Sequence, residues 1–85
     1  MRPDYRSRVE ALKSVEAFCY TLCVHLLTEE RLATAAAKLA LIDLFQDDSF
    51  LQAQGEERLI RVRKKTVARA LELLSDPSRR VAAEA

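Results

Sequence analysis

Six basic side chains lie between positions 58 and 69 of this 85-residue chain, in a stretch without acidic residues. Four of them are spaced three, four and four residues apart, which places them on one face of a helix because a helix repeats every 3.6 residues. Such a face can bind phosphate groups or an acidic protein surface, and it can equally be a solvated face without a ligand. The four are Arg58, Arg61, Lys65 and Arg69, and with Arg63 and Lys64 we call them the basic stripe.

The residues before the basic stripe have the opposite charge. Residues 39–57 hold five acidic side chains and no Lys or Arg, so the net charge of +1 conceals two blocks of opposite sign. The totals of 14 basic and 13 acidic residues exclude a strongly polycationic protein, and nucleic-acid binding would depend on the stripe alone. No aromatic residue follows position 55, so bases could not stack there. We therefore expect any nucleic-acid contact to be with the backbone.

Two cysteines and one histidine lie close together in the first third of the chain. Cys19 and Cys23 are one helical turn apart, and a helix holds their backbones in poor geometry for a disulfide. His25 is the only histidine and points to a different side of such a helix, so a metal site would lack ligands. We expect the cysteines to be small core residues in a reducing compartment, with no metal.

The other polar residues do not form a catalytic set. Asp47-Asp48 and Glu56-Glu57 are explained as turn and helix-start residues, and no Gly-rich phosphate loop is present. Catalysis requires convergent groups such as a nucleophile with its base, and the pattern offers none. We therefore predict a protein that is not an enzyme and has no cofactor.

The elements that position these residues are predicted to be helices. With only one Gly and two Pro, the chain has little material for tight turns, and good helix formers dominate its composition. Hydrophobic periodicity predicts helices over about residues 4–27, 29–46 and 56–74. Asp4 and Thr28 are the expected N-caps of the first two. Residues 46–55 are expected to be a connection with Gly55 as its hinge.

The apolar pattern predicts which residues form the core. The second helix is Ala-rich and apolar on most sides, so its neighbours should cover it, with Asp43 partly buried at the margin. Phe50 and Leu51 are expected to fold back over the end of the bundle. The third helix is predicted to bury one apolar face, made of Leu59, Ile60, Val62, Val67, Ala70, Leu71 and Leu74.

These elements predict an all-α fold, a small three-helix bundle in one domain over residues 1–75. Residues 76–85 are expected to be a tail or to hold a short fourth helix over residues 78–84. No apolar signal core follows Met1, and the longest uncharged apolar stretch is too short to cross a bilayer. We expect a soluble, cytoplasmic protein with no membrane contact.

The order of these features resembles region 2 of bacterial RNA polymerase sigma factors, chiefly the extracytoplasmic-function type. The likeness covers residues 18–71, about two thirds of the chain. Five groups of residues resemble motifs of this family, in the same order along the chain. They are Leu-Leu-Thr at 26–28; Glu29, Glu30, Leu32 and Ala33; Ala40, Leu41, Leu44 and Phe45; Phe50; and the basic and apolar run at 59–68.

The resemblance implies that the second helix contacts the polymerase clamp and that the last helix faces the promoter. Thr34, Lys38 and Leu39 would be the polymerase-facing residues. Family members usually have polar, often acidic residues there, and Leu59 and Ile60 replace the aromatic residues that usually capture melted bases. A second DNA-reading domain is not among the 85 residues. A degenerate relative, or half of a two-chain factor, fits these departures better than promoter melting by this chain alone.

Two functional hypotheses follow from the sequence. The first is a non-catalytic helical module that acts in transcription by binding the RNA polymerase core, another transcription-factor subunit or the DNA backbone. Its binding residues would be Arg58, Arg61, Lys64, Lys65 and Arg69. The second is a homodimeric protein-interaction module without a nucleic-acid role, since a chain this short has a thin core that dimerisation would support.

Overall fold

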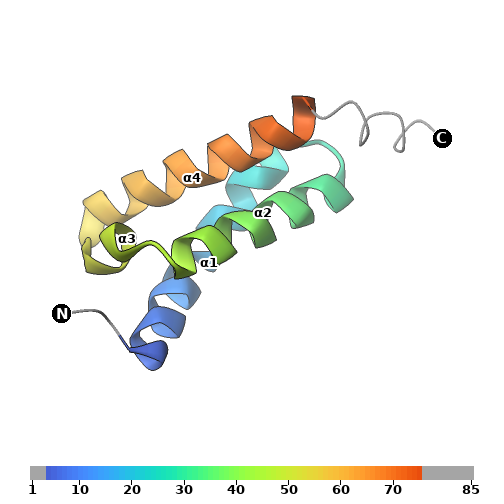
Figure 1. The fold of residues 1–85 in the computed structure, drawn as a ribbon. Coiled ribbons are helices and arrows are strands. Elements are labelled where there is room, and N and C mark those ends of the chain that lie inside the picture. The colour runs from blue at the N-terminus through green and yellow to red at the C-terminus, as the bar shows by residue number, and fades with distance from the viewer. Residues whose placement is uncertain (1–3, 76–85) are drawn as a thin grey trace.

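The computed structural model describes residues 4–75, and these form four helices. They are α1 (Tyr5–Leu26), α2 (Glu30–Phe45), α3 (Asp48–Gln52) and α4 (Gly55–Ser75). The three long helices pack against one another in pairs, and α3 lies at the end of the bundle where the chain passes from α2 to α4 (Figure 1). The predicted all-α three-helix bundle is confirmed. The short helix predicted over residues 78–84 lies outside the described residues.

Local hydrogen bonds explain where the first two helices begin. The carboxylate of Asp4 accepts a hydrogen bond from the backbone N–H of Ser7 at 2.8 Å, so the predicted N-cap of α1 is confirmed. That hydrogen bond lowers the pKa of Asp4. The prediction that Thr28 caps α2 is wrong. The N-cap is Glu29, whose carbonyl accepts the first helical hydrogen bond from Ala33, so Thr28 lies one residue too early to cap the helix.

The connection between α2 and α4 is more ordered than the sequence predicted. It contains the short helix α3, whose N-cap Asp47 accepts hydrogen bonds from the backbone N–H groups of Ser49 and Phe50 at 2.9 Å and 3.3 Å. Phe50 and Leu51 are buried, which confirms the prediction that they close the end of the bundle. Gly55 has a φ of 58°, a left-handed conformation that glycine adopts readily, and α4 begins there.

The core lies where the three long helices meet. Small residues of α2 are buried there, which allows α1 and α4 to approach closely on two sides. Cys19 and Cys23 of α1 are fully buried, which confirms their prediction as core residues. The Sγ of Cys19 lies 3.2 Å from Oγ1 of Thr66 on α4, within hydrogen-bond distance, so this buried hydroxyl has a partner.

The face of α4 that enters the core differs from the prediction. The buried residues are Val62, Thr66, Ala70 and Leu73, of which only two were predicted. The core accepts Thr66 because its hydroxyl is paired with Cys19, a contact that helical periodicity cannot reveal. Four residues predicted to be buried remain substantially exposed, namely Leu59 (41%), Ile60 (48%), Leu71 (54%) and Leu74 (44%).

This difference has a simple physical origin. If the apolar face of an α-helix is wider than the area that its neighbours cover, only part of that face is buried. Along most of its length α4 is covered only by α1 and α2. The uncovered part of this apolar face therefore lies on the surface of the protein.

No helix in the described part of the chain is long and apolar enough to cross a membrane.

Candidate binding surfaces on helix α4

The basic stripe lies on α4, and the structure divides it into two groups. Three arginines use their guanidinium groups in contacts within the bundle. The other three cations form no salt bridge with residues 4–75, although the charge of Lys65 helps to lower the pKa of Asp43. The first group is Arg58, Arg61 and Arg69, and the second is Arg63, Lys64 and Lys65.

Arg58 connects α4 to the end of α3. Its Nε donates to the carbonyl of Ala53 at 2.9 Å, and one terminal nitrogen donates to the carbonyl of Leu51 at 3.1 Å. The guanidinium carbon also lies 5.3 Å from the centre of the Phe50 ring, within the range of a cation–π interaction. Arg58 therefore holds the connection against α4 and offers little to an external ligand.

Arg69 connects α4 to α2. It donates to both carboxylate oxygens of Asp43, from Nε at 2.6 Å and from a terminal nitrogen at 2.9 Å, and its other terminal nitrogen donates to Glu72 at 3.0 Å. The hydrogen bonds from Arg69 are the main reason that the pKa of Asp43 is lowered. The pKa of Arg69 is raised in turn, chiefly by its hydrogen bond with Asp43. The prediction that Asp43 is partly buried is confirmed.

Arg61 is only partly used within the molecule. One terminal nitrogen donates to Glu57 one turn earlier at 3.1 Å, and this pair is exposed to solvent. Its Nε is covered and has no hydrogen-bond partner among the residues that the structure describes. Exposed pairs of this spacing contribute little to stability, so Arg61 can exchange Glu57 for an external anion at small cost.

Lys64 and Lys65 lie beside Arg61, and the three residues line a small hollow between α4 and the start of α3. The hollow has a volume of about 200 Å³ and is also lined by Asp47 and Ala68. Because Lys64 and Lys65 form no salt bridge within residues 4–75, this middle part of the stripe is its accessible part. We call Arg61, Lys64 and Lys65 the open cation cluster.

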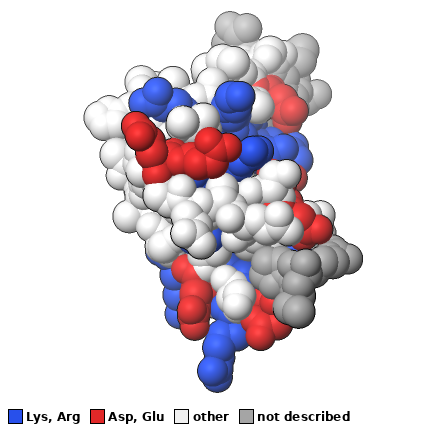
Figure 2. All heavy atoms as spheres, turned by 90° about the vertical axis from the view of Figure 1, so that its left-hand side faces the viewer, with Lys and Arg blue, Asp and Glu red and all other residues white. Residues whose placement is uncertain are grey.

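The acidic and basic blocks of the sequence do not form two separate charged regions on the surface at the α3 end of the bundle. Figure 2 shows Lys and Arg side chains next to Asp and Glu side chains on this face, rather than one basic and one acidic region. Ion pairs such as that of Arg61 with Glu57 account for part of this mixing. The local field of the stripe is therefore weaker than the sequence suggests.

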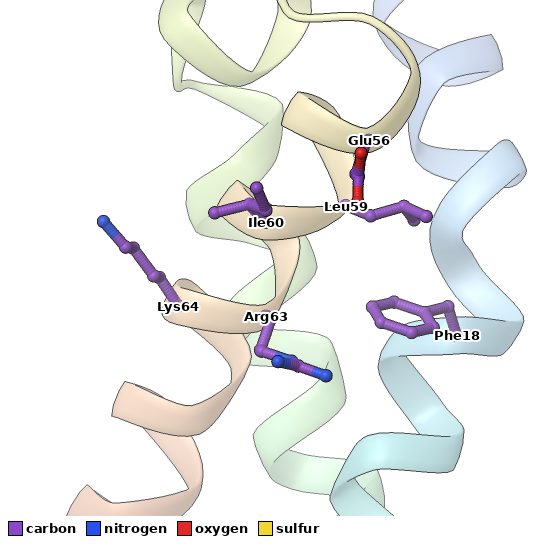
Figure 3. Close-up of a pocket in the computed structure, with 6 residues that line it drawn as sticks. All are labelled: Phe18, Glu56, Leu59, Ile60, Arg63 and Lys64. Atoms are coloured by element: carbon purple, nitrogen blue, oxygen red, sulfur yellow. The ribbon is translucent and has the colours of Figure 1, made fainter.

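A second surface lies on the other flank of α4, where the helix meets α1. It is a groove of about 480 Å³ lined by Phe18 of α1 and by Glu56, Leu59, Ile60, Arg63 and Lys64 of α4. Figure 3 shows Leu59 and Arg63 extending from α4 toward the ring of Phe18, with Ile60 and Lys64 on the outer side of the helix. Sequence reasoning did not assign a role to Phe18 or single out Arg63, although the surplus apolar width of α4 was a signal for this groove.

The residues expected to face the polymerase do not share one surface. Thr34 and Lys38 on α2 line a groove of about 370 Å³ against α1, together with Glu16 and Tyr20 among others. Leu39 is not part of that groove and packs, partly buried, against the core. The structure therefore brings two of the three residues together.

The thiols and the histidine do not form a metal centre with neighbouring groups. Within residues 4–75 no group of three His, Cys, Asp or Glu side chains is close enough to hold a metal ion. His25 is exposed near the end of α1, whereas both thiols are in the core. Burial is the main reason that the pKa values of both thiols are raised, and the pKa of Cys23 is raised to about 11.

No family model, no curated protein and no solved structure matches this chain. The resemblance to region 2 of sigma factors therefore stays a prediction. Functional conclusions depend on the surfaces themselves, chiefly the open cation cluster and the groove between α1 and α4.

Proposed function

We propose that this chain is a non-catalytic helical binding module, resembling region 2 of sigma factors, that acts in transcription by contacting RNA polymerase or the DNA backbone. The observation that carries the proposal is the open cation cluster. Lys64 and Lys65 have no ion-pair partner within residues 4–75, and Arg61 beside them has only an exposed one. Three cations around one hollow favour a multiply charged anionic surface such as a phosphate backbone.

The placement of the described carboxylates supports a non-catalytic role. Asp43 is held by Arg69, Asp47 caps α3, and Glu57 pairs with Arg61. Each of these groups has a structural partner, and none faces a nucleophile or a second carboxylate in a pocket. Binding rather than bond-making is the chemistry that such a surface supports.

The proposed contacts with DNA would not depend on base sequence. The open cation cluster has no aromatic side chain beside it, so stacking on bases is not available, and Lys and Arg would grip phosphates. For polymerase contact we assign Thr34 and Lys38, which share a groove on the far side of α2 from Asp43 and Arg69. Leu39 supports that helix from its partly buried position.

The test is binding to the bacterial RNA polymerase core and to fluorescein-labelled duplex DNA. Co-elution with the polymerase in gel filtration with light scattering measures the first, and fluorescence anisotropy at several salt concentrations measures the second. The variant is Lys64→Glu with Lys65→Glu. The matched control is Lys13→Glu with Arg31→Glu, which changes the net charge equally at exposed positions of α1 and α2.

We expect the Lys64/Lys65 variant to lose binding while the Lys13/Arg31 variant keeps most of it. For DNA, removing two phosphate contacts should reduce the slope of log affinity against log salt by about 2. Equal losses in the two variants would mean that only the overall charge matters. No binding to either ligand at low salt would refute the proposal.

A second candidate function is a homodimeric interaction module, which the exposed apolar edge between α1 and α2 favours. Ile42 is 58% exposed and lines a hollow of about 300 Å³ with Leu12, Leu41 and Phe45. Burying this edge against a second copy would cover apolar area that the bundle leaves in water. Light scattering over a concentration series tests it: Ile42→Glu should convert a dimer to a monomer, and a wild type that stays monomeric at high micromolar concentration excludes it.

A further inference from the structure

The groove between α1 and α4 has an apolar floor that the fold leaves uncovered. Phe18 of α1 and Leu59 of α4 face each other across it, and Ile60 extends the apolar surface around the outer side of α4 (Figure 3). Both α4 residues are exposed although their side chains are large and apolar. The same flank of α4 continues to exposed Leu71 and Leu74, so the apolar surface extends along the helix.

The walls of the groove determine what kind of backbone can occupy it. Both walls are helices, whose backbone N–H and C=O groups are used within the helices themselves. An extended peptide would therefore find no edge to pair with and would leave its own backbone groups unpaired. A helix satisfies its backbone internally and offers a row of side chains at every third or fourth position. The groove therefore fits a helix better than a strand.

The charges at the groove determine what that helix must carry. Arg63 and Lys64 lie at one end and form no salt bridge with residues 4–75, whereas Glu56 lies about two turns earlier, in the first turn of α4. Arg63 extends over the apolar floor toward Phe18 (Figure 3). An occupant with carboxylates beside Arg63 and Lys64, and none beside Glu56, matches this pattern, because opposite charges favour association and like charges oppose it.

We propose that this groove binds an amphipathic α-helix of a partner protein, with its apolar face on Phe18, Leu59 and Ile60 and its carboxylates on Arg63 and Lys64. The added helix would pack against both α1 and α4 as a fourth long helix of the bundle. This inference goes beyond the proposed function, because Arg61 and Lys65 line a hollow on the other flank of α4 and, among the described residues, Lys64 is the one that lines both hollows. Failure of polymerase or DNA binding would leave it standing.

The experiment uses a fluorescein-labelled synthetic amphipathic helix with leucines on one face and glutamates beside them. Two peptides serve as controls: one has the same composition in scrambled order, and the other has lysines in place of the glutamates. Fluorescence anisotropy is measured against the full chain. We expect saturable binding of the acidic helix and at least about tenfold weaker binding of both controls.

Two variants at exposed β-branched residues identify the surface. Ile60→Glu places a charge in the groove, and Val24→Glu places the same charge on α1, where the side chain is 44% exposed and lines none of the hollows described above. Circular dichroism and thermal unfolding confirm that each variant remains folded. Ile60→Glu should weaken binding of the acidic helix about tenfold or more, and Val24→Glu should leave it within about twofold.

Charge exchange provides a test that does not depend on apolar packing. The double variant Arg63→Glu with Lys64→Glu should prefer the lysine peptide over the acidic one. Retained preference for the acidic peptide, equal binding of the scrambled peptide, or equal effects of Ile60→Glu and Val24→Glu would each overturn the proposal. Vesicles of phosphatidylcholine with phosphatidylserine are the last comparison: binding to these vesicles in place of the peptide would identify a lipid surface instead and would also overturn it.

Discussion

Arg69 on α4 donates two hydrogen bonds to the two carboxylate oxygens of Asp43 on α2, at 2.6 Å and 2.9 Å. Paired hydrogen bonds between a guanidinium and a carboxylate are stronger and more directional than a single one. The pair therefore fixes α4 against α2 at one position along their length. The most C-terminal residue of the basic stripe is thus part of the bundle's own structure.

The first prediction concerns the contribution of this pair to stability. Asp43→Asn removes the charge and one of the two oxygens that accept from Arg69, and we expect it to lower the free energy of unfolding at pH 7 by about 1 kcal/mol. Urea denaturation measures the change. Glu57→Gln is the matched control, because it neutralises a carboxylate in an exposed pair and should cost about 0.5 kcal/mol or less. Equal effects of the two variants would contradict the structural role of Asp43.

The same pair predicts how stability depends on pH. Hydrogen bonds from Arg69 hold the pKa of Asp43 below its usual 3.8, so the folded protein favours the charged carboxylate. The resulting stabilisation is fully present above the usual pKa and is lost as the pH falls through the lowered one. The difference in unfolding free energy between wild type and Asp43→Asn should therefore shrink as the pH falls below 3.8. A difference that is constant from pH 7 to pH 2 would refute this assignment.

The second prediction separates the two groups of the basic stripe. Arg58→Lys keeps the charge but loses the planar fork that reaches the carbonyls of Leu51 and Ala53, so we expect a loss of about 1–2 kcal/mol in unfolding free energy. Lys64→Ala removes a charge at an exposed position and should change stability by less than about 0.5 kcal/mol. Thermal unfolding compares the two. A stable Arg58→Lys variant would show that the fork is dispensable.

The third prediction concerns the turn that starts α4. A Cβ on Gly55 would meet no atom within 4 Å, so a substitution there changes backbone conformational energy without creating a clash. With φ at 58°, Gly55→Ala should cost about 1 kcal/mol, and Gly55→Asn should cost less because asparagine tolerates the left-handed region. Chemical denaturation of both variants checks the order. If the two variants were equally destabilised, side-chain effects would have to explain the loss.

The long helices could be predicted from the sequence because their signals are local. Apolar residues at helical spacing, the Asp4 cap and the single Gly55 mark elements that the structure contains within one residue or so at each end. The helix α3 escaped prediction because its five residues are held by the cap of Asp47 and by burial of Phe50, and so depend on the finished bundle.

The candidate site was less predictable because side-chain partners are not local. Arg8 shows this: it donates to the carbonyl of Phe45 at the end of α2 and pairs with Asp48 at 3.2 Å, across about 40 residues of sequence. Helical spacing placed Arg58, Arg61, Lys65 and Arg69 on one face of α4, but it could not show that Arg58 and Arg69 are already engaged within the bundle. Similarly, periodicity predicted a wide apolar face on α4 without indicating which part α1 and α2 would cover.

The last prediction concerns the buried thiols. Burial, with the neighbouring Cys19 as a smaller cause, raises the pKa of Cys23 from its usual 9.0 to about 11. A difference of this size reduces the thiolate fraction near pH 8 by about a hundredfold, so alkylation of Cys23 by iodoacetamide in the native protein should be slower by at least about that factor than in urea. Labelling followed by mass spectrometry measures both rates.

The raised pKa of Cys23 also fixes the sign of a pH effect at the alkaline end. A thiol whose folded pKa is raised stabilises the fold fully below its unfolded pKa, and that contribution is lost as the pH rises from 9.0 to about 11. Wild type should therefore lose more stability across this interval than Cys23→Ala, in which this thiol is absent. Denaturant unfolding at several pH values gives the comparison. Parallel curves for the two proteins would mean that Cys23 ionises equally well in the folded and unfolded chains, which would contradict its burial.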